Sequence, residues 1–445
     1  MVASGPEGEA AVTDLGTSDG PPGSRQSLAS LASSNPLARE AALTRVVLFT
    51  GKGGVGKTSL AAASAVSAAR RGSRVLVTST DAAHSLADAF GTPLGDRPAP
   101  VQVDGVLLHA QQLDAQRRLE RHWGQVQAYL AALLSWGGIG DVLAEELVLL
   151  PGLEELFALF DLRSQVAGGA YDLVVVDCAP TAETLKLLSL PEALRFYGDR
   201  VLGPGRALKR AIAPLTRTRG PAGGHLPLPD EEVVDAVSEV HGNLAAIHAL
   251  LTDVDRSSVR LVVNPERLVL AEAERTATAL SLFGYGIDAV IVNRILPEAV
   301  DGPYLAGWRE RHREHTATAR RVFAPVPVLE VPLLEEEVIG IQALARLGEL
   351  TYGTLDPGAV LHRQRPLSLA EEDGRHVLRL VLPFATEDDL TLSRAGDDLQ
   401  VTVGSWRRNV QLPAALRRRS VDGARLVDGV LEIRFVGEPA PVGRT

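Results

Sequence analysis

Sulfur is nearly absent from this chain, which has one cysteine (Cys178) and one methionine (Met1) in 445 residues. A lone thiol excludes an internal disulfide and a metal site built from several thiolates of one chain. Stability therefore has to come from an apolar core, and a hydrophobic fraction of 45% with a mean hydropathy of +0.08 is ample for one. The length predicts two or three folded units.

Long apolar runs are also missing. No stretch approaches the roughly eighteen uninterrupted apolar residues that a membrane span needs, so no membrane-spanning segment is expected. Residues 1–40 lack the apolar segment of a signal peptide, and their Gly, Ser, Ala and Pro content predicts disorder. A formal net charge of −10 argues against a general nucleic-acid-binding surface. We expect a cytoplasmic protein that does not bind nucleic acid.

A glycine-rich stretch following residues 46–49 (VVLF) organises the rest of the chain. The apolar run predicts a buried parallel strand, and the alanine-rich run after residue 59 predicts a helix. Strand, G-x-x-x-x-G-K-T and helix in this order form the context of a phosphate-binding loop. The residues expected to bind nucleotide are Gly51, Lys52, Gly53, Gly54, Val55, Gly56, Lys57, Thr58 and Ser59. Lys57 would reach the β- and γ-phosphates, and Thr58 would ligate Mg²⁺.

Lys52 adds a second lysine early in the loop, where ordinary phosphate-binding loops have none. This pattern resembles the deviant Walker A motif of the ParA, MinD, nitrogenase-iron-protein and ArsA group of dimeric ATPases. The resemblance implies that the extra lysine reaches across a two-fold interface to the partner's nucleotide. It therefore implies a homodimer that binds ATP, with Lys52 and Lys57 in catalytic roles.

Residues 74–80 (RVLVTST) predict a second strand, which ends at Asp81. The phrase S-T-D-x-A-H-S-L-x-D-A-F resembles switch I of the ArsA family, which includes the arsenite-pump ATPase and the targeting factor for tail-anchored membrane proteins. The family usually has proline where this chain has Ala82. The match implies that Asp81 is catalytic and polarises the attacking water; a helix N-cap is the alternative role, and the two roles are compatible.

Residues 171–177 (YDLVVVD) show the Walker B pattern, an apolar strand ending in an aspartate. Asp177 would hold Mg²⁺ through water. The next residues resemble switch II of the family, with three departures: Cys178 for Thr, Ala182 for Gly and Glu183 for His. Loss of the glycine stiffens the backbone, so it is an open question whether this segment moves as far as switch II does in the family. Cys178 is expected to be a small buried residue.

Four later residues match family elements that contact nucleotide. Glu266 falls in the P-E-R element after a predicted strand at 259–264, and Asn293 ends another strand. The match implies that the Asn293 amide reads the adenine edge and that Pro332 and Leu333 close over the base. The resemblance covers about residues 45–352, with mostly helical insertions at about 115–165 and 195–255.

One family feature is absent. Targeting factors of the eukaryotic type carry a C-x-x-C pair soon after the adenine-reading asparagine and bind zinc there. The corresponding stretch, residues 301–308, has no cysteine, so no zinc is expected.

The composition changes near residue 356. Alternating apolar residues at 376–382, with further short runs at 390–393, 399–403 and 430–436, predict a small β-sandwich. Phrases such as V-L-R-L-V-L-P and D-G-V-L-E-I-R-F resemble an α-crystallin domain. Only residues 405–408 separate its third strand from the next phrase, which is too short for the exchange strand by which many such domains dimerise.

The expected fold is thus an α/β P-loop NTPase with a mostly parallel sheet and helical insertions, followed by an all-β α-crystallin-like sandwich. The expected boundaries are a tail at 1–43, the ATPase domain at 44–354, a linker at 355–367, the sandwich at 368–437 and a tail at 438–445.

The resemblance implies Mg²⁺-dependent ATP hydrolysis, which three kinds of function would use. The first is a chaperone or targeting factor for hydrophobic protein clients, which the α-crystallin resemblance favours. The lack of methionine beyond Met1 counts against it, because promiscuous grooves often use methionine. The alternative is the motor of an arsenite pump, which a single cysteine does not favour because arsenite binds thiolates. The third is a positioning ATPase of the ParA or MinD kind. Its DNA binding conflicts with the net negative charge of this chain. The sequence identifies neither the client nor a membrane receptor.

Overall fold

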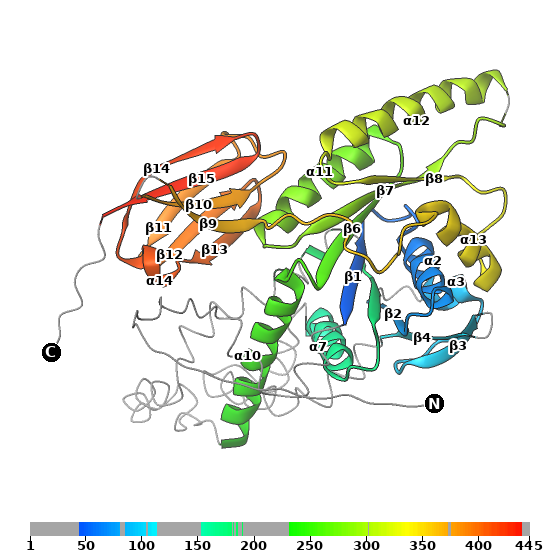
Figure 1. Ribbon diagram of the computed structural model, residues 1–445, viewed down its shortest axis with the longest axis horizontal. Coiled ribbons are helices and arrows are strands. Elements are labelled where there is room, and N and C mark those ends of the chain that lie inside the picture. The colour runs from blue at the N-terminus through cyan, green and yellow to red at the C-terminus, as the bar shows by residue number, and fades with distance from the viewer. Residues whose placement is uncertain are drawn as a thin grey trace, which may run out of the picture.

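A computed structural model describes residues 44–80, 85–103, 106–113, 153–179, 181, 184–185, 189, 231–300, 302–372 and 375–437. Its larger part is an eight-stranded sheet in the order β3-β4-β2-β5-β1-β6-β7-β8 (Figure 1). The strands are β1 (Arg45–Thr50), β2 (Val75–Ser79), β3 (Ala99–Val103), β4 (Val106–Gln112), β5 (Leu173–Asp177), β6 (Ser257–Val263), β7 (Ile287–Ile295) and β8 (Val328–Pro332). All neighbours are parallel except β3 and β4, which are antiparallel. The expected mostly parallel α/β sheet is confirmed.

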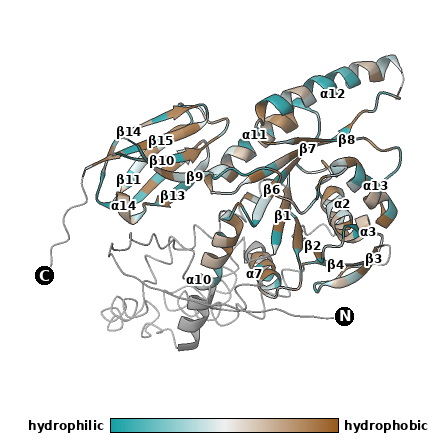
Figure 2. Ribbon diagram, viewed as in Figure 1, coloured by the Kyte–Doolittle hydropathy of each residue, from teal (hydrophilic) through white to brown (hydrophobic). Residues whose placement is uncertain are grey.

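The central strands are apolar because they are covered on both faces, as parallel strands are. Every residue of β1, β2, β5 and β6 is buried, and much of this central part of the sheet is brown in Figure 2. Helices α2, α3 and α13 lie on one side of β1, and α7 and α10 lie on the other (Figure 1). The helices are α2 (Lys57–Arg70), α3 (Ser85–Phe90), α7 (Leu153–Ala167), α10 (Glu231–Thr252), α11 (Arg267–Leu282), α12 (Pro303–Val322) and α13 (Gly340–Tyr352).

A buried ion network joins three strands to the segment that leaves the ATPase part. Asp288 of β7 is fully buried, and its carboxylate accepts from Arg45 Nη2 at 3.1 Å and from Arg260 Nε at 3.2 Å. Burial lowers the pKa of Arg45 to about 10, although Asp288 opposes the shift. The same carboxylate accepts the Leu361 N–H at 3.3 Å, and Arg260 donates to the Ala359 carbonyl at 3.1 Å. This network ties the connecting segment to the sheet.

The C-terminal part is a sandwich of two antiparallel sheets, with orders β14-β15-β10-β9 and β11-β12-β13. Its elements are β9 (Leu367–Glu372), β10 (Arg375–Val381), β11 (Leu390–Ala395), β12 (Asp398–Val403), β13 (Trp406–Gln411), α14 (Ala414–Arg417), β14 (Ser420–Val427) and β15 (Val430–Val436). Val403 pairs with Trp406 across a turn formed by Gly404 and Ser405. No exchange strand therefore lies between β12 and β13. The predicted all-β sandwich is confirmed.

Among the described residues, no helix is both long and apolar enough to cross a membrane.

Candidate functional site

The loop after β1 is held tightly against the sheet by its first glycine. Gly51 has φ +152°, and a Cβ placed there would lie 2.2 Å from the Val262 carbonyl oxygen of β6. Gly54 and Gly56 also have positive φ, at +81° and +96°. A Cβ on Gly53 or Gly54 would meet no atom within 4 Å, so the middle of the loop faces open space. Glycine is required at Gly51 by contact and at Gly54 and Gly56 by conformation.

The loop ends at the N-terminus of α2, which presents positive charge. Gly56 is the N-cap and makes no side-chain capping bond, and the first turn has no acidic residue. Lys57 is only 6% exposed, and its Nζ donates to the Lys52 carbonyl at 3.3 Å. Lys52 itself is exposed, and Ser59 is half-buried in the same first turn. A glycine-rich loop, a helix N-terminus and a buried ammonium form an arrangement that fits a polyphosphate.

Two oxygen side chains lie at the neighbouring strand ends. Phe49 of β1 pairs with Asp177, the fully buried last residue of β5, so that this carboxylate stands beside the loop. Its Oδ2 accepts from the Ser79 hydroxyl at 3.2 Å. The Thr58 hydroxyl lies 3.1 Å from that of Ser85. Carboxylate and hydroxyl oxygens are ligands that suit Mg²⁺, so the residues present fit this ion.

Asp81, the predicted water-polarising residue, lies outside the described residues, as do Ala82, Ala182 and Glu183. The residue before it is placed: Thr80 N–H donates to the Asp177 carbonyl at 2.9 Å. The chain therefore leaves β2 beside Asp177.

Asn293 lies directly against the loop and is 6% exposed; it does not end its strand as expected, because β7 continues for two more residues to Ile295. Its Nδ2 donates to the Val55 carbonyl at 2.8 Å, and a Cβ on Gly56 would lie 2.4 Å from that nitrogen. Leu333 follows β8, is 42% exposed and donates its N–H to the Ile295 carbonyl at 2.8 Å. The structure thus brings the ends of β7 and β8 together beside the loop.

Glu266 and Pro332 complete the predicted set. Glu266 is exposed and is the N-cap of α11, where its carbonyl accepts the Leu270 N–H at 3.0 Å. Pro332 ends β8 and pairs with Ile295. Both residues lie at the carboxyl edge of the sheet, where parallel sheets place their ligands.

Two residues missed by the sequence reasoning touch the loop or its helix. Arg294 has φ +61°, and its Nη1 donates to the Gly54 carbonyl at 2.8 Å. Ser85 contacts Thr58, as described above. Both stand next to residues already singled out, Arg294 after Asn293 and Ser85 within the switch I phrase. That adjacency was the only signal available.

Cys178 is fully buried, as predicted. Burial raises the pKa of its thiol far above the usual range, and the charge of Asp177 acts in the same direction. The thiolate that binds soft metals or arsenite is therefore strongly disfavoured.

Two family models match this chain, one for each of its two parts. A family model described as an anion-transporting ATPase matches residues 44–353, and one described as an HSP20-like domain found in ArsA matches residues 373–435. Both parts of the chain thus have counterparts in one family.

Curated relatives match this chain over most of their own length. The "Putative arsenical pump-driving ATPase 1" of Aquifex aeolicus is 34% identical over 390 residues, which cover 86% of this chain and 97% of that protein. An uncharacterized protein of Streptomyces coelicolor is 37% identical over 405 residues, which cover 90% of this chain and 100% of that protein. A protein named ATPase GET3 of Phaeosphaeria nodorum is 27% identical over 314 residues, which cover 68% of this chain and 93% of that protein.

Proposed function

Because the chain belongs to the ArsA family of anion-transporting ATPases and is itself an ATPase, we propose that it hydrolyses ATP as a Mg²⁺-dependent homodimer and that its nucleotide state controls the binding of hydrophobic protein clients. The observation that supports this most strongly is the loop after β1. It holds Lys57 buried and aimed back into the loop, while Lys52 is exposed.

In this proposal the two lysines have separate tasks. Lys57, the α2 N-terminus and the N–H groups of residues 51–59 bind the β- and γ-phosphates and stabilise the charge that develops during transfer. Lys52 extends to the nucleotide of the second subunit. Thr58 would hold Mg²⁺ directly and Asp177 would hold it through water; the ion, when bound, neutralises phosphate charge. Asp81 orients the attacking water.

Asn293 is proposed to read the adenine edge with the end of its amide that does not bind the loop. The Val55 contact fixes the plane of that amide before nucleotide arrives. Glu266, Pro332 and the exposed Leu333 would form the walls around the nucleoside. Arg294, bound to the Gly54 carbonyl, adds a positive charge beside the phosphates.

Exposed apolar residues support association through the carboxyl edge of the sheet. Leu268 is 74% exposed one residue after the start of α11, and Ile339 is 56% exposed after β8. Tyr304, 77% exposed, lies at the start of α12, which follows β7. Each lies in a segment that follows the carboxyl end of a strand. Exposed apolar side chains in these segments would supply part of the apolar surface that an interface needs.

A pump motor is not favoured by the chain's own chemistry. Arsenite binds thiolates, and the one thiol is buried with a raised pKa. A client-binding role is supported by the sandwich, which matches an HSP20-like domain, and by kinship with proteins named GET3.

Lys52→Ala tests the shared site. The variant should fold and bind ATP through Lys57 but lose at least about 10²-fold in hydrolysis rate, as expected when a charge at the developing oxyanion is removed. An excess of mutant subunits should suppress wild-type turnover. Arg346→Ala, which removes an exposed cation on α13, is the control and should do neither.

Unchanged wild-type activity in demonstrably mixed dimers would contradict the shared site. The client arm is tested by crosslinking the purified protein to an apolar helical peptide in its ADP and ATP states. Equal crosslinking in both states would contradict the proposal that the nucleotide state controls client binding.

A further inference from the structure

Helix α11 belongs to both parts of the molecule. Its last residue, Leu282, is fully buried in the hydrophobic core of the sandwich, among Leu380, Val401 and their neighbours. The Ser281 hydroxyl donates to the Val381 carbonyl at 2.5 Å, and Arg408 Nη1 of β13 donates to the Leu282 carbonyl at 2.5 Å. The C-terminal turn of α11 is therefore part of the sandwich.

Residues just beyond the helix extend this contact. Phe283 packs edge-on against Trp406 of β13, with ring centroids 6.1 Å apart. Thr278, one turn earlier, hydrogen-bonds the Pro383 carbonyl. Together with the fully buried Leu282, these contacts make sandwich and helix end one packed unit, which resists deformation as protein cores do.

The other half of α11 lies on the phosphate-binding loop. Glu272, Ala273 and Thr276 line one small cavity together with Gly51 and Lys52. Thr181, from the stretch that resembles switch II, lines it too, and its hydroxyl is buried with no hydrogen-bond partner among the residues that the structure describes. The cavity volume is only about 10 Å³, so this part of the helix packs closely on the loop. A shift of the loop or of Thr181 toward the helix would therefore press on this half of α11.

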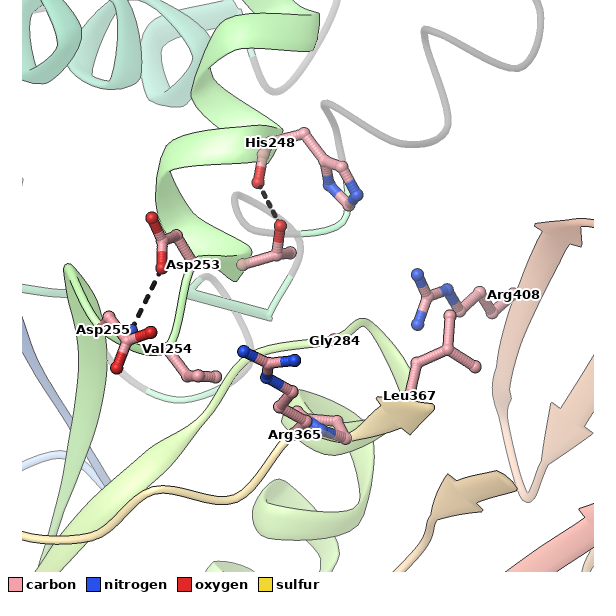
Figure 3. Close-up of a pocket in the computed structure, with 10 residues that line it drawn as sticks. His248, Asp253, Val254, Asp255, Gly284, Arg365, Leu367 and Arg408 are labelled. Atoms are coloured by element: carbon pink, nitrogen blue, oxygen red, sulfur yellow. Dashed lines mark hydrogen bonds between the residues drawn. The ribbon is translucent and has the colours of Figure 1, made fainter. Parts of the chain in front are cut away.

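Two cavities flank the junction. One of about 360 Å³ separates the end of α10, with His248 and Asp253, from Arg365 and Arg408 (Figure 3). The other, of about 170 Å³, has β10 and β15 on one side and the turn at residues 323–326 on the other. The sandwich is packed on the end of α11, and its Phe384 also packs edge-on against Phe323, just after α12, with ring centroids 5.4 Å apart. The larger cavity separates it from the end of α10, which leaves room for it to move relative to α10.

We propose that α11 is a rigid lever that transmits the nucleotide state of the phosphate-binding loop to the β-sandwich, turning the sandwich relative to α10. The inference rests on the proposed nucleotide site. The helix has 16 residues, so it spans about 24 Å at 1.5 Å per residue. A shift of 1–2 Å in a packed helix is the usual size of such a displacement, and a unit fixed to its far end must follow.

The motion can be measured with spin labels, because the native thiol is buried and leaves introduced cysteines as the reactive ones. One full-length variant has Ala249→Cys on α10 and Ser405→Cys on the sandwich; both positions are exposed. The second has Arg275→Cys on α11 and Ser405→Cys. ADP and a non-hydrolysable ATP analogue should shift the first distance by about 2 Å or more. The second distance should stay constant.

Leu282→Ala uncouples the lever, and Leu416→Ala is its control. Both leucines are fully buried in the sandwich core, but Leu416 lies on α14 and not on α11. Leu282→Ala should abolish the shift. Since coupling is reciprocal, it should also change ATP affinity by about 5-fold or more, whereas Leu416→Ala should leave both intact.

Nucleotide binding is measured calorimetrically on the same labelled samples, which separates the two proposals. Bound nucleotide with an unchanged first distance, or with a second distance that changes equally, overturns the lever and leaves the proposed function standing. Absence of nucleotide binding overturns both. Loss of the shift in both leucine variants would mean that sandwich stability, and not the α11 contact, controls the motion, which also overturns the lever.

Discussion

Replacing Asp288 with asparagine would remove a charge from a place that water does not reach. The carboxylate has no exposed surface, and neither does Arg260 beside it; Arg45 is 10% exposed. Asparagine keeps the shape but directs an NH₂ group at one of the guanidinium groups, where both partners are donors. Two buried cations would then face one neutral amide.

The size of the effect follows from this burial. Removing one partner of a buried ion pair costs about 3–5 kcal/mol, because the remaining charge is left uncompensated. A domain is stable by only about 5–15 kcal/mol, so Asp288→Asn should remove a large share of the stability of the ATPase part. With an m-value of about 3 kcal/mol per M urea, the unfolding midpoint should fall by about 1 M or more.

The assay is urea unfolding followed by the far-UV circular dichroism of the helices, since α14 is the sole helix of the sandwich in the described part of the chain. Asp172→Asn is the matched control. Asp172 also binds an arginine, Arg74 at 2.7 Å, but the two side chains are 47% and 61% exposed. That change should cost about 0–1 kcal/mol. Equal shifts in the two variants would refute the argument from burial.

Three further outcomes are expected. Asp81→Asn should keep ATP binding and lower turnover at least about 10²-fold, as measured by phosphate release; turnover within about two-fold of wild type would remove Asp81 from the mechanism. Cys178 should not react with a thiol reagent in the native protein and should give one equivalent in denaturant, because burial raises its pKa; fast native labelling would contradict that burial. His312 accepts the Leu296 N–H at Nδ1, and burial lowers its pKa. The stability from this contact should be complete above about pH 6.5 and be lost as the pH falls through the lowered value. The protection of the Leu296 amide, which is its exchange rate relative to the intrinsic rate at each pH, should therefore fall in acid, and a pH-independent protection would contradict the contact.

The parts predicted from sequence are those with a local pattern. Apolar runs predicted β1, β2 and β5 to within two residues, because strands buried on both faces are apolar along most of their length and carry polar residues mainly at their ends. The alternation at 376–382 likewise predicted β10, whose side chains face alternately in and out. The glycine pattern predicted the turn after β1, because Gly51 has no room for a Cβ.

What escaped prediction depends on residues far apart in the chain. Arg45 and Asp288 are separated by 243 positions, and no local pattern announces their pairing. The antiparallel pair β3–β4 was missed as well, since β3 has only five residues and one of them is a proline. The role of Leu282 was hidden for another reason: in sequence it is the last apolar residue of an ATPase helix, and only the fold places it in the sandwich.

The Asp288 network also has a consequence for synthesis on the ribosome. Arg45 opens β1, yet its carboxylate partner is made 243 residues later. At about 5–20 residues per second, that interval is roughly 12–50 s. During it the first strands can pair with one another, but the arginine of β1 has no Asp288 to bind and would be costly to bury. The nascent sheet should therefore stay open along β1 until β7 has emerged, which gives chaperones at the exit tunnel tens of seconds to act on a chain that is more than half made.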